Sequence, residues 1–269
     1  MRAGAEVFGL LWHHRALVVA LVRRDLAARY RASLLGYLWS MLNPLLLLAV
    51  YAVVFTTVFQ PRMAGAKPYA LFLFAGLLPW LFFSGALLDA AMTLVDNGPL
   101  LAKVVCPAEV FPAVTVLAHL VHHVLALPVL LAGLAGCAVL GLHPFPWTVL
   151  LLPLALVPWV LLTGGLAMAI SAVGVHFRDT RDLLANLLNL LFFGTPIIYT
   201  LDGLHVVWLK RLLQLNPLAS VIEVYRSLAF SGRFAPATDW AVALGVGLVA
   251  WIIGAWLFLR LRDTLVEAV

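Results

Sequence analysis

The sequence predicts an all-α membrane protein with six transmembrane helices. Hydrophobic residues make up 64% of the 269 positions and charged residues only 11%, and the mean hydropathy is +1.07. These values exceed what the core of a water-soluble domain of this length requires. Six apolar runs approach or exceed the roughly 20 residues that cross about 30 Å of hydrocarbon. They lie near residues 36–60, 69–95, 112–141, 148–175, 183–200 and 238–259, and the fifth is the weakest.

An amphipathic helix is expected before the first span. Over residues 4–31 apolar side chains such as Val7, Leu11 and Val18 recur among His and Arg residues. A helix with one apolar and one charged face lies in the membrane interface instead of crossing it. We therefore expect an N-terminal interface helix within residues 1–35, a six-span domain over 36–260 and a C-terminal tail over 261–269.

Basic residues indicate the orientation of the chain. Most of the 17 Lys and Arg fall on the segments that share a side with the N-terminus. Because basic residues mark cytoplasmic flanks, both termini are expected in the cytoplasm. The net charge of +5 does not indicate nucleic-acid binding, since no soluble basic domain is present to carry it.

The loop after the second span, residues 96–112, has turn residues at both ends and a short apolar stretch between them. It is expected to present a small helix to the cytoplasm, and the alternative is a simple connector. Cys106 lies on this loop and Cys137 deep in a span, so a disulfide is not expected.

An outer segment, residues 201–237, contains two apolar groups separated by Asn216-Pro217. Each group is shorter than about 18 residues, which favours two short interfacial or re-entrant helices over a span. Such backbone is tolerated at membrane depth only against protein or a water-filled cavity, which suggests a gate at the outer mouth. Glu223 and Arg226 share a helical face there, and the alternative for them is an ordinary surface ion pair.

Three blocks of the sequence carry a family resemblance. They are Arg24-Asp25-Leu26-x-x-Arg29-Tyr30-Arg31-x-Ser33-x-Leu35-Gly36-x-x-Trp39 with Asn43-Pro44-Leu45, then Asn97 to Pro112, and finally Asn216-Pro217-Leu218 leading to Glu223-x-Tyr225-Arg226. In this order and spacing the chain resembles the membrane subunit of ABC-type polysaccharide exporters, the permeases for O-antigen, capsule and teichoic acid. The first block is the most specific, and the resemblance covers nearly the whole chain.

The resemblance implies a bacterial inner-membrane homodimer that encloses a continuous channel, with two copies of a separate cytoplasmic ATPase beneath it. The implied substrate is a polysaccharide on a polyprenyl diphosphate lipid, and O-antigen is the polysaccharide expected first. Membrane lipids are the other expected partner. Arg24, Arg29 and Arg31 would then lie at the entrance for the lipid diphosphate, because arginine matches phosphate oxygens bidentately. The alternative for these arginines is anchoring on anionic lipid.

Two further sets of residues take roles from the same resemblance. The coupling loop for the ATPase would be formed by Pro99, Leu100, Lys103, Val104, Cys106, Pro107 and Glu109, and the outer gate by Asn216, Pro217, Glu223, Tyr225 and Arg226. Cys106 departs from the family pattern, in which an aromatic residue commonly precedes the proline.

No phosphate-binding motif for ATP is present in the chain. The motif G-x-x-x-x-G-K-[ST] needs a lysine directly after glycine. Ala66, Ala102 and Leu209 precede the three lysines. The chain is therefore expected to be a transport subunit without enzymatic activity or cofactor of its own, with ATP and Mg on the partner ATPase.

Aromatic residues are candidates for the translocation path, because sugar rings place their C–H faces flat on aromatic rings. Tyr51, Phe55 and Phe59 recur every four residues on the first span, and Trp39 precedes them. The fifth span adds Phe192, Phe193 and Tyr199. The alternative is that these rings face lipid or belong to the interfacial aromatic belt.

Asp89 is a carboxylate within the second span, where an unpaired charge costs about 2.5–3.5 kcal/mol. Counted along the helices, His119 on the third span reaches a similar depth, with His122 on the neighbouring face. We predict that Asp89 pairs with His119 or His122. The histidines at 119, 122 and 123 are also spaced as metal ligands, but no carboxylate or thiolate cluster completes a site.

Two other functions remain open at this point. One is an ABC permease for a small drug or lipid, which would have a short closed pocket in place of an extended aromatic channel. The other is a membrane-embedded enzyme that modifies glycans, which would need a convergent acid and base in one water-accessible pocket.

Overall fold

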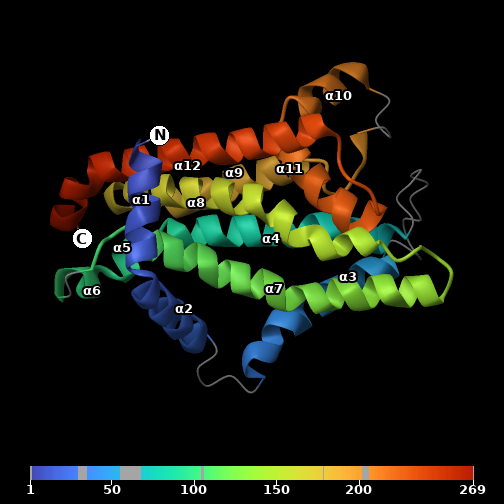
Figure 1. Cartoon of the computed structure of the whole chain (residues 1–269), viewed down its shortest axis with the longest axis horizontal. Helices are drawn as coiled ribbons and strands as arrows, with labels where there is room; N and C mark the ends of the chain where they lie inside the picture. Colours follow the sequence, from blue (N-terminus) through green and yellow to red (C-terminus); the bar gives the residue numbers. More distant parts are fainter. Residues whose placement is uncertain are drawn as a thin grey trace.

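The computed structural model describes residues 2–29, 35–54, 68–103, 106–177, 179–201 and 206–268. Within these ranges the regular structure is helical and contains no strand, which confirms the predicted class. Figure 1 shows an elongated bundle whose long helices follow one axis. They are α4 (Tyr69–Ala90), α7 (Val110–Val139), α8 (Leu152–His176), α9 (Thr180–Phe193) and α12 (Ala237–Ala268), and α3 (Trp39–Val53) runs obliquely to them (Figure 1).

Four of the described helices are long and apolar enough to cross a membrane: Tyr69–Ala90, Val110–Val139, Trp147–His176, which includes the 3-10 turn η3 (Trp147–Leu151), and Ala237–Arg262. A fifth would be counted if the bent pair α1 (Arg2–His13) and α2 (Arg15–Arg29) formed one span. The protein is thus a multi-pass membrane protein. Most of the second predicted span, and the third, fourth and sixth, coincide with these four helices.

The first and fifth predicted spans correspond to shorter helices. α3 has 15 residues and follows the 3-10 turn η1 (Gly36–Leu38), and residues 55–60 of the predicted run lie outside the described part of the chain. α9 ends at Phe193, and Gly194 is its C-terminal cap residue. Turns follow, because Pro196 cannot continue a helix. The sequence stays apolar to residue 200, so hydropathy alone did not predict the end of the helix at Phe193.

The N-terminal segment forms two helices, whereas the sequence predicted one. α1 and α2 meet at His14 with a bend of 75°. α1 packs on α12, where Val7 is buried and Trp251 Nε1 donates a hydrogen bond to the Gly4 carbonyl (3.2 Å). α2 packs instead on α7 through Val18, Leu21, Val22 and Leu26. Because the two apolar faces are buried against different helices, a straight helix cannot satisfy both.

The tightest packing in the bundle joins α8 and α12. A Cβ atom added to Gly254 would lie 1.9 Å from the carbonyl oxygen of Gly165, and one added to Gly165 would lie 2.2 Å from that of Ala250. Small residues at a helix interface let two backbones approach closely, which is a common device in membrane proteins. These two helices therefore pack backbone against backbone around Gly165 and Gly254.

The two ends of the bundle carry the short elements. The basal end contains α1, α2, α5 (Thr93–Asp96), α6 (Gly98–Lys103) and the C-terminal part of α12 (Figure 1). The apical end contains α10 (Val207–Gln214), α11 (Pro217–Arg226), the π-helical turn η5 (Ser227–Ser231) and the turn after α7, where Gly141 has a φ of 68°. The helix α12 continues to Ala268, so the expected C-terminal tail is helical.

Candidate functional site

The N-terminal helix α2 is joined to α4 by an arginine. Arg29 donates from Nε to Asp25 Oδ2 (2.9 Å) and from Nη2 to Asp89 Oδ2 (2.8 Å). Burial opposes the charge of Arg29, but the hydrogen bonds with Asp25 and Asp89 outweigh it and raise the pKa of the guanidinium. Arg24 donates to Asn97 Oδ1 (3.0 Å), and Arg31 lies outside the described residues. Arg29 is thus held between two carboxylates.

Asp89 and His119 lie in direct contact. His119 Nε2 donates to Asp89 Oδ2 over 2.9 Å, so one carboxylate oxygen accepts from both Arg29 and His119. His122, the other predicted partner, forms a hydrogen bond with Ser40 of α3 instead (2.9 Å between Oγ and Nδ1). A carboxylate inside a span is stabilised by such donors, which offset the cost of its burial.

The third histidine of the segment contacts the apical helix α11. Tyr225, which is completely buried, donates from its hydroxyl to His123 Nε2 (3.1 Å), and His123 Nδ1 donates to the Leu78 carbonyl (3.3 Å). The three histidines therefore point to three different neighbours. Among the described residues no group of three or more His, Cys, Asp and Glu side chains is arranged to hold a metal ion.

A groove of about 560 Å³ runs along this histidine segment, which is defined here as His119, His122 and His123. Its walls come from the end of α2, from α3, from α4 and from α7. The lining residues are Arg29, Trp39, Ser40, Asn43, Pro44, Leu47, Leu78, Leu81, Phe82, His119, His122, His123 and Ala126. The lining of the groove thus combines polar and apolar side chains.

At the apical end, Asn216 fixes the start of α11. Its Oδ1 accepts from the backbone N–H of Leu218 (3.0 Å), and Pro217 occupies the first helical turn, where a missing N–H costs nothing. Its Nδ2 donates to the carbonyl of Gly194 (2.7 Å) and to Thr195 Oγ1 (3.0 Å). The Asn-Pro pair therefore attaches α11 to the turn that ends α9.

Arg226 is buried, whereas a surface ion pair was the alternative expectation. Its guanidinium lies 4.1 Å above the Phe72 ring and donates to the Ile197 carbonyl (2.8 Å), and its Nε has no hydrogen-bond partner among the described residues. The close approach requires Gly76, because a Cβ there would lie 2.3 Å from Arg226 Nη2. Glu223 pairs instead with Arg233 (3.3 Å). Burial raises the pKa of Glu223, against the opposing effects of Arg226 and Arg233.

The predicted coupling loop is only partly turned outward. Pro99 is exposed, whereas Leu100 and Cys106 pack against buried residues of the bundle, and Pro107 is half-buried. Glu109 is fully buried and accepts from Arg262 Nη1 of α12 (3.3 Å). Val104 and the side chain of Lys103 lie outside the described part of the structure. Glu109 therefore anchors the loop to α12.

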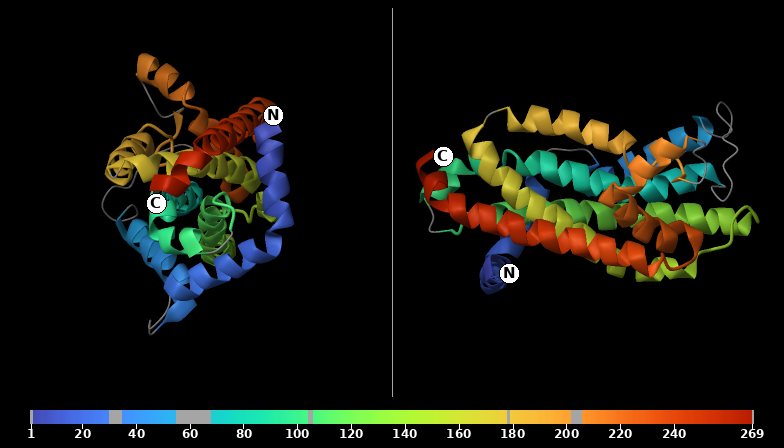
Figure 2. Two further views of the ribbon diagram at one scale, coloured as in Figure 1. Left: turned by 90° about the vertical axis from the view of Figure 1, so that its left-hand side faces the viewer. Right: turned by 90° about the horizontal axis from the view of Figure 1, so that it is seen from above.

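The predicted path-lining aromatics lie on α3, on α9 and in the turn after α9. Tyr51 and Phe192 are half-buried against the core, and Phe192 contacts Trp80 with ring centroids 5.7 Å apart. Trp39 and Phe193 are exposed, and the Tyr199 hydroxyl donates to the Phe193 carbonyl (2.8 Å). Both views in Figure 2 place α3 and α9 on the side of the bundle opposite α1. The positions Phe55 and Phe59 are outside the described residues.

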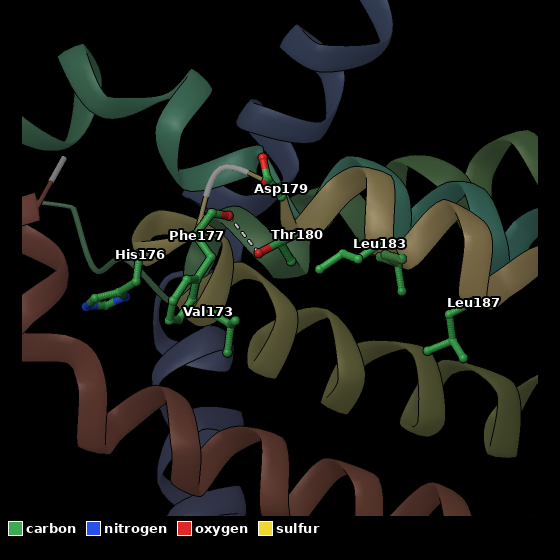
Figure 3. Close-up of a pocket in the computed structure, with 8 residues that line it drawn as sticks. Val173, His176, Phe177, Asp179, Thr180, Leu183 and Leu187 are labelled. Carbon is green, nitrogen blue, oxygen red and sulfur yellow. Dashed lines mark hydrogen bonds between the residues drawn. The ribbon is translucent and has the colours of Figure 1, made fainter.

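A second hollow, of about 540 Å³, lies at the basal end where α8 passes into α9. Figure 3 shows its lining, with Thr180 Oγ1 donating to the Phe177 carbonyl over 2.7 Å. Phe177, Leu183 and Leu187 are exposed there, which makes this wall of the hollow apolar. Arg178, which lies between Phe177 and Asp179, is not among the described residues.

Sequence reasoning missed three of these contacts: His123 with Tyr225, Glu109 with Arg262, and Arg226 with Phe72. Each joins residues that are far apart in the chain, so local spacing contains no signal for it. A buried ionisable residue in an otherwise apolar region does indicate that a partner exists, and that signal was available for Glu109.

Comparison with known proteins places the chain in a family. The ABC-2 type transporter family model matches residues 16–230. The O-antigen export system permease protein RfbA of Myxococcus xanthus is 34% identical over 96% of this chain and 97% of its own length. A protein of the same name from Klebsiella pneumoniae is 29% identical over 93% and 94%, and the polysialic acid transport protein KpsM of Escherichia coli is 26% identical over 97% of both chains. These matches confirm the resemblance found in the three sequence blocks, and the chain therefore belongs to the ABC-2 type transporter family, as a membrane permease subunit.

Proposed function

We propose that this chain is the permease subunit of an ATP-driven exporter for O-antigen, carried as a polysaccharide on polyprenyl diphosphate. The observation that carries the proposal is the nearly full-length likeness to proteins named O-antigen export permeases in two bacterial genera. A near-complete match is a stronger basis than a shared fold, because folds host many functions.

The energy source in this proposal is a separate ATPase in the cytoplasm. The three lysines of the chain stand outside any phosphate-binding motif, so ATP and Mg would be bound by the partner. Two copies of the ATPase would serve two copies of the permease in the inner membrane. The cytoplasmic side is then the basal end, because both termini and most of the basic residues belong there.

Six spans follow if α3 and α9 cross with the four longer helices. The 14 residues of α9 extend about 21 Å, so the turn after Phe193 would complete the crossing. The bent pair α1–α2 lies across the basal ends of the other helices in Figure 1, as an interface helix does. On this topology α11 enters from the apical side and returns, in the manner of a re-entrant gate.

The channel would form where two permeases meet at α3 and α9. These helices share one side of the bundle (Figure 2) and expose apolar rows there. On α9 the row is Leu183, Leu187, Leu190 and Phe193, and on α3 it is Leu45, Leu46, Val50 and Val53. A second copy could cover part of each row, and Trp39, Tyr51, Phe55, Phe59, Phe192, Phe193 and Tyr199 would line the space between the copies.

The ATPase would dock at the basal end on the exposed part of the loop from Pro99 to Pro107 and on the interface helix. Glu109 would act from inside, since its contact with Arg262 ties the loop to α12. Docking performs work only if the ATPase contacts the loop differently in its ATP-bound and ATP-free states.

The entrance for the lipid diphosphate would involve Arg24, Arg29 and Arg31. In the described structure Arg29 is held by Asp25 and Asp89, so a diphosphate would have to compete with two carboxylates for it. Arg24 has no carboxylate to displace in its hydrogen bond with the neutral Asn97.

Inverted membrane vesicles that contain the permease and its ATPase test the proposal. Added ATP should move polyprenyl-diphosphate-linked O-antigen into the lumen, where it becomes protected from added glycosidase. Vesicles whose ATPase lacks its phosphate-binding lysine serve as the matched control. ATP-dependent movement of a fluorescent phospholipid without movement of the glycan would refute the proposal in favour of a permease for small lipids.

A further inference from the structure

The histidine segment of α7 forms hydrogen bonds with three other helices within little more than one turn, and through Asp89 it is linked to a fourth. His119 reaches Asp89 of α4, which also holds Arg29 of α2. His122 reaches Ser40 of α3, and His123 reaches Tyr225 of α11 and the Leu78 carbonyl of α4. These bonds connect elements that are up to 102 positions apart in the chain. The segment is therefore a meeting point of basal and apical elements.

The contact between His123 and Tyr225 has a defined direction. A neutral imidazole offers one donor and one acceptor nitrogen. With the tyrosine hydroxyl donating to Nε2, the proton lies on Nδ1, which donates to the Leu78 carbonyl. Both side chains are buried, so either group would be costly to leave without a partner. The position of α11 in the bundle is therefore tied to the position of α7.

The contact between His119 and Asp89 ties the same helix to the basal end. Arg29 lies in the last turn of α2 and shares Asp89 Oδ2 with His119, at 2.8 Å and 2.9 Å. A displacement of α2 cannot leave this arrangement unchanged, because a hydrogen bond stretched beyond about 3.5 Å is lost. Figure 1 shows α2 at the basal end and α11 at the apical end, with α7 running between them.

The groove beside the segment provides room for a change of partners. Its volume of about 560 Å³ adjoins Arg29 and all three histidines, whereas the α8–α12 interface leaves no such space. Side chains next to free volume can exchange rotamers, while tightly packed helices move as one body. Movement at the basal end would therefore pass along the α2–α4–α7 side of the bundle.

We propose that His119 and His123 are positioning residues which make the apical helix α11 follow displacements of the interface helix α2. Asp89 connects the histidine segment with α2 at the basal end, and Tyr225 connects it with α11 at the apical end. The inference rests on the proposed function, in which the ATPase drives α2 and α11 belongs to the outer gate. To that function it adds the residues that connect α2 with α11.

A double-mutant cycle tests this connection in the complete complex of permease and ATPase. Asp89→Asn and Tyr225→Phe remove one charge and one hydroxyl while preserving the shape of each side chain. The readout is the amount of polyprenyl-diphosphate-linked O-antigen transported per ATP hydrolysed in inverted vesicles. Each single variant is expected to lower this ratio about five-fold, and the double variant by about the same five-fold, since both interrupt one connection.

Independent sites would give a different result. Effects of residues without shared partners multiply, so two unconnected five-fold losses would give about 25-fold. The matched control is Thr148→Val, which removes a hydroxyl that donates to the Leu228 carbonyl (2.7 Å) at the same apical end. This variant should leave the ratio unchanged, and combined with Asp89→Asn it should give only the loss of Asp89→Asn.

Several outcomes would overturn the inference. A ratio near 25-fold lower in the double variant, or a Tyr225→Phe complex with the wild-type ratio, would each refute it. If either variant fails to assemble with the ATPase, the cycle is run with His119→Gln and His123→Gln, and the same two criteria apply. A wild-type complex that transports no glycan refutes the proposed function and this inference together, whereas wild-type transport with multiplying effects refutes the inference alone.

Discussion

Replacement of Gly254 by alanine should destabilise the permease strongly. The added Cβ would lie 1.9 Å from the Gly165 carbonyl oxygen, and real Cβ atoms essentially never come within 3.0 Å of such a neighbour. The obstacle is backbone, so α12 must move away from α8 by about 1.1 Å at this point. A radial gap of about 0.5–1 Å already forfeits a quarter to a half of the dispersion energy of the atoms that line it.

The expected loss in the free energy of unfolding is about 3 kcal/mol, at the upper end of what overpacking costs. Gly245→Ala on the same helix is the matched control, because nothing lies within 4 Å of its added Cβ. It should change the free energy of unfolding by less than about 1 kcal/mol. The assay is unfolding by SDS in mixed micelles, followed by the fluorescence of the nine tryptophans. Equal midpoints for the two variants would refute the close packing of α8 and α12.

Three further predictions concern the two ends of the bundle. Burial raises the pKa of the Cys106 thiol, so with the other cysteine replaced by alanine its maleimide labelling at pH 8 should be slower than that of free cysteine; an equal rate would contradict the burial. Arg262→Ala leaves the buried Glu109 carboxylate without its cation and should cost about 3 kcal/mol of unfolding free energy, measured by the same SDS assay; a wild-type midpoint would show the pair to be inert. Gly76→Ala should displace the Arg226 guanidinium and cost about 1–2 kcal/mol, and an unchanged unfolding midpoint would show that the arginine adapts without loss.

Much of the fold could be predicted because a long apolar run directly indicates a helix long enough to span a membrane. The helices α4, α7, α8 and α12 coincide with long apolar runs. The short helices α10 and α11 follow from the stop that Asn216-Pro217 imposes. The end of α9 at Phe193 was missed because hydropathy does not register the helix-breaking effect of Gly194 and Pro196.

Contacts of the candidate site could be predicted only where the free-energy cost of a charge in the membrane required a hydrogen-bond partner. Asp89 needs a donor at its depth in the membrane, and counting along two helices was enough to find His119. The bend at His14 depends on two separate packing partners, α12 and α7, which no local pattern reveals. The burial of Arg226 likewise depends on Gly76 and Phe72, which lie about 150 positions earlier in the chain.

The most direct test of the exporter account is the ATPase activity of the purified permease. It is measured for the permease alone and for its complex with the partner ATPase, each with and without polyprenyl-diphosphate-linked O-antigen. The account predicts no hydrolysis by the permease alone, and hydrolysis by the complex that changes when the glycan is added. A permease that recruits no ATPase, or a complex whose hydrolysis is indifferent to the glycan, would contradict it.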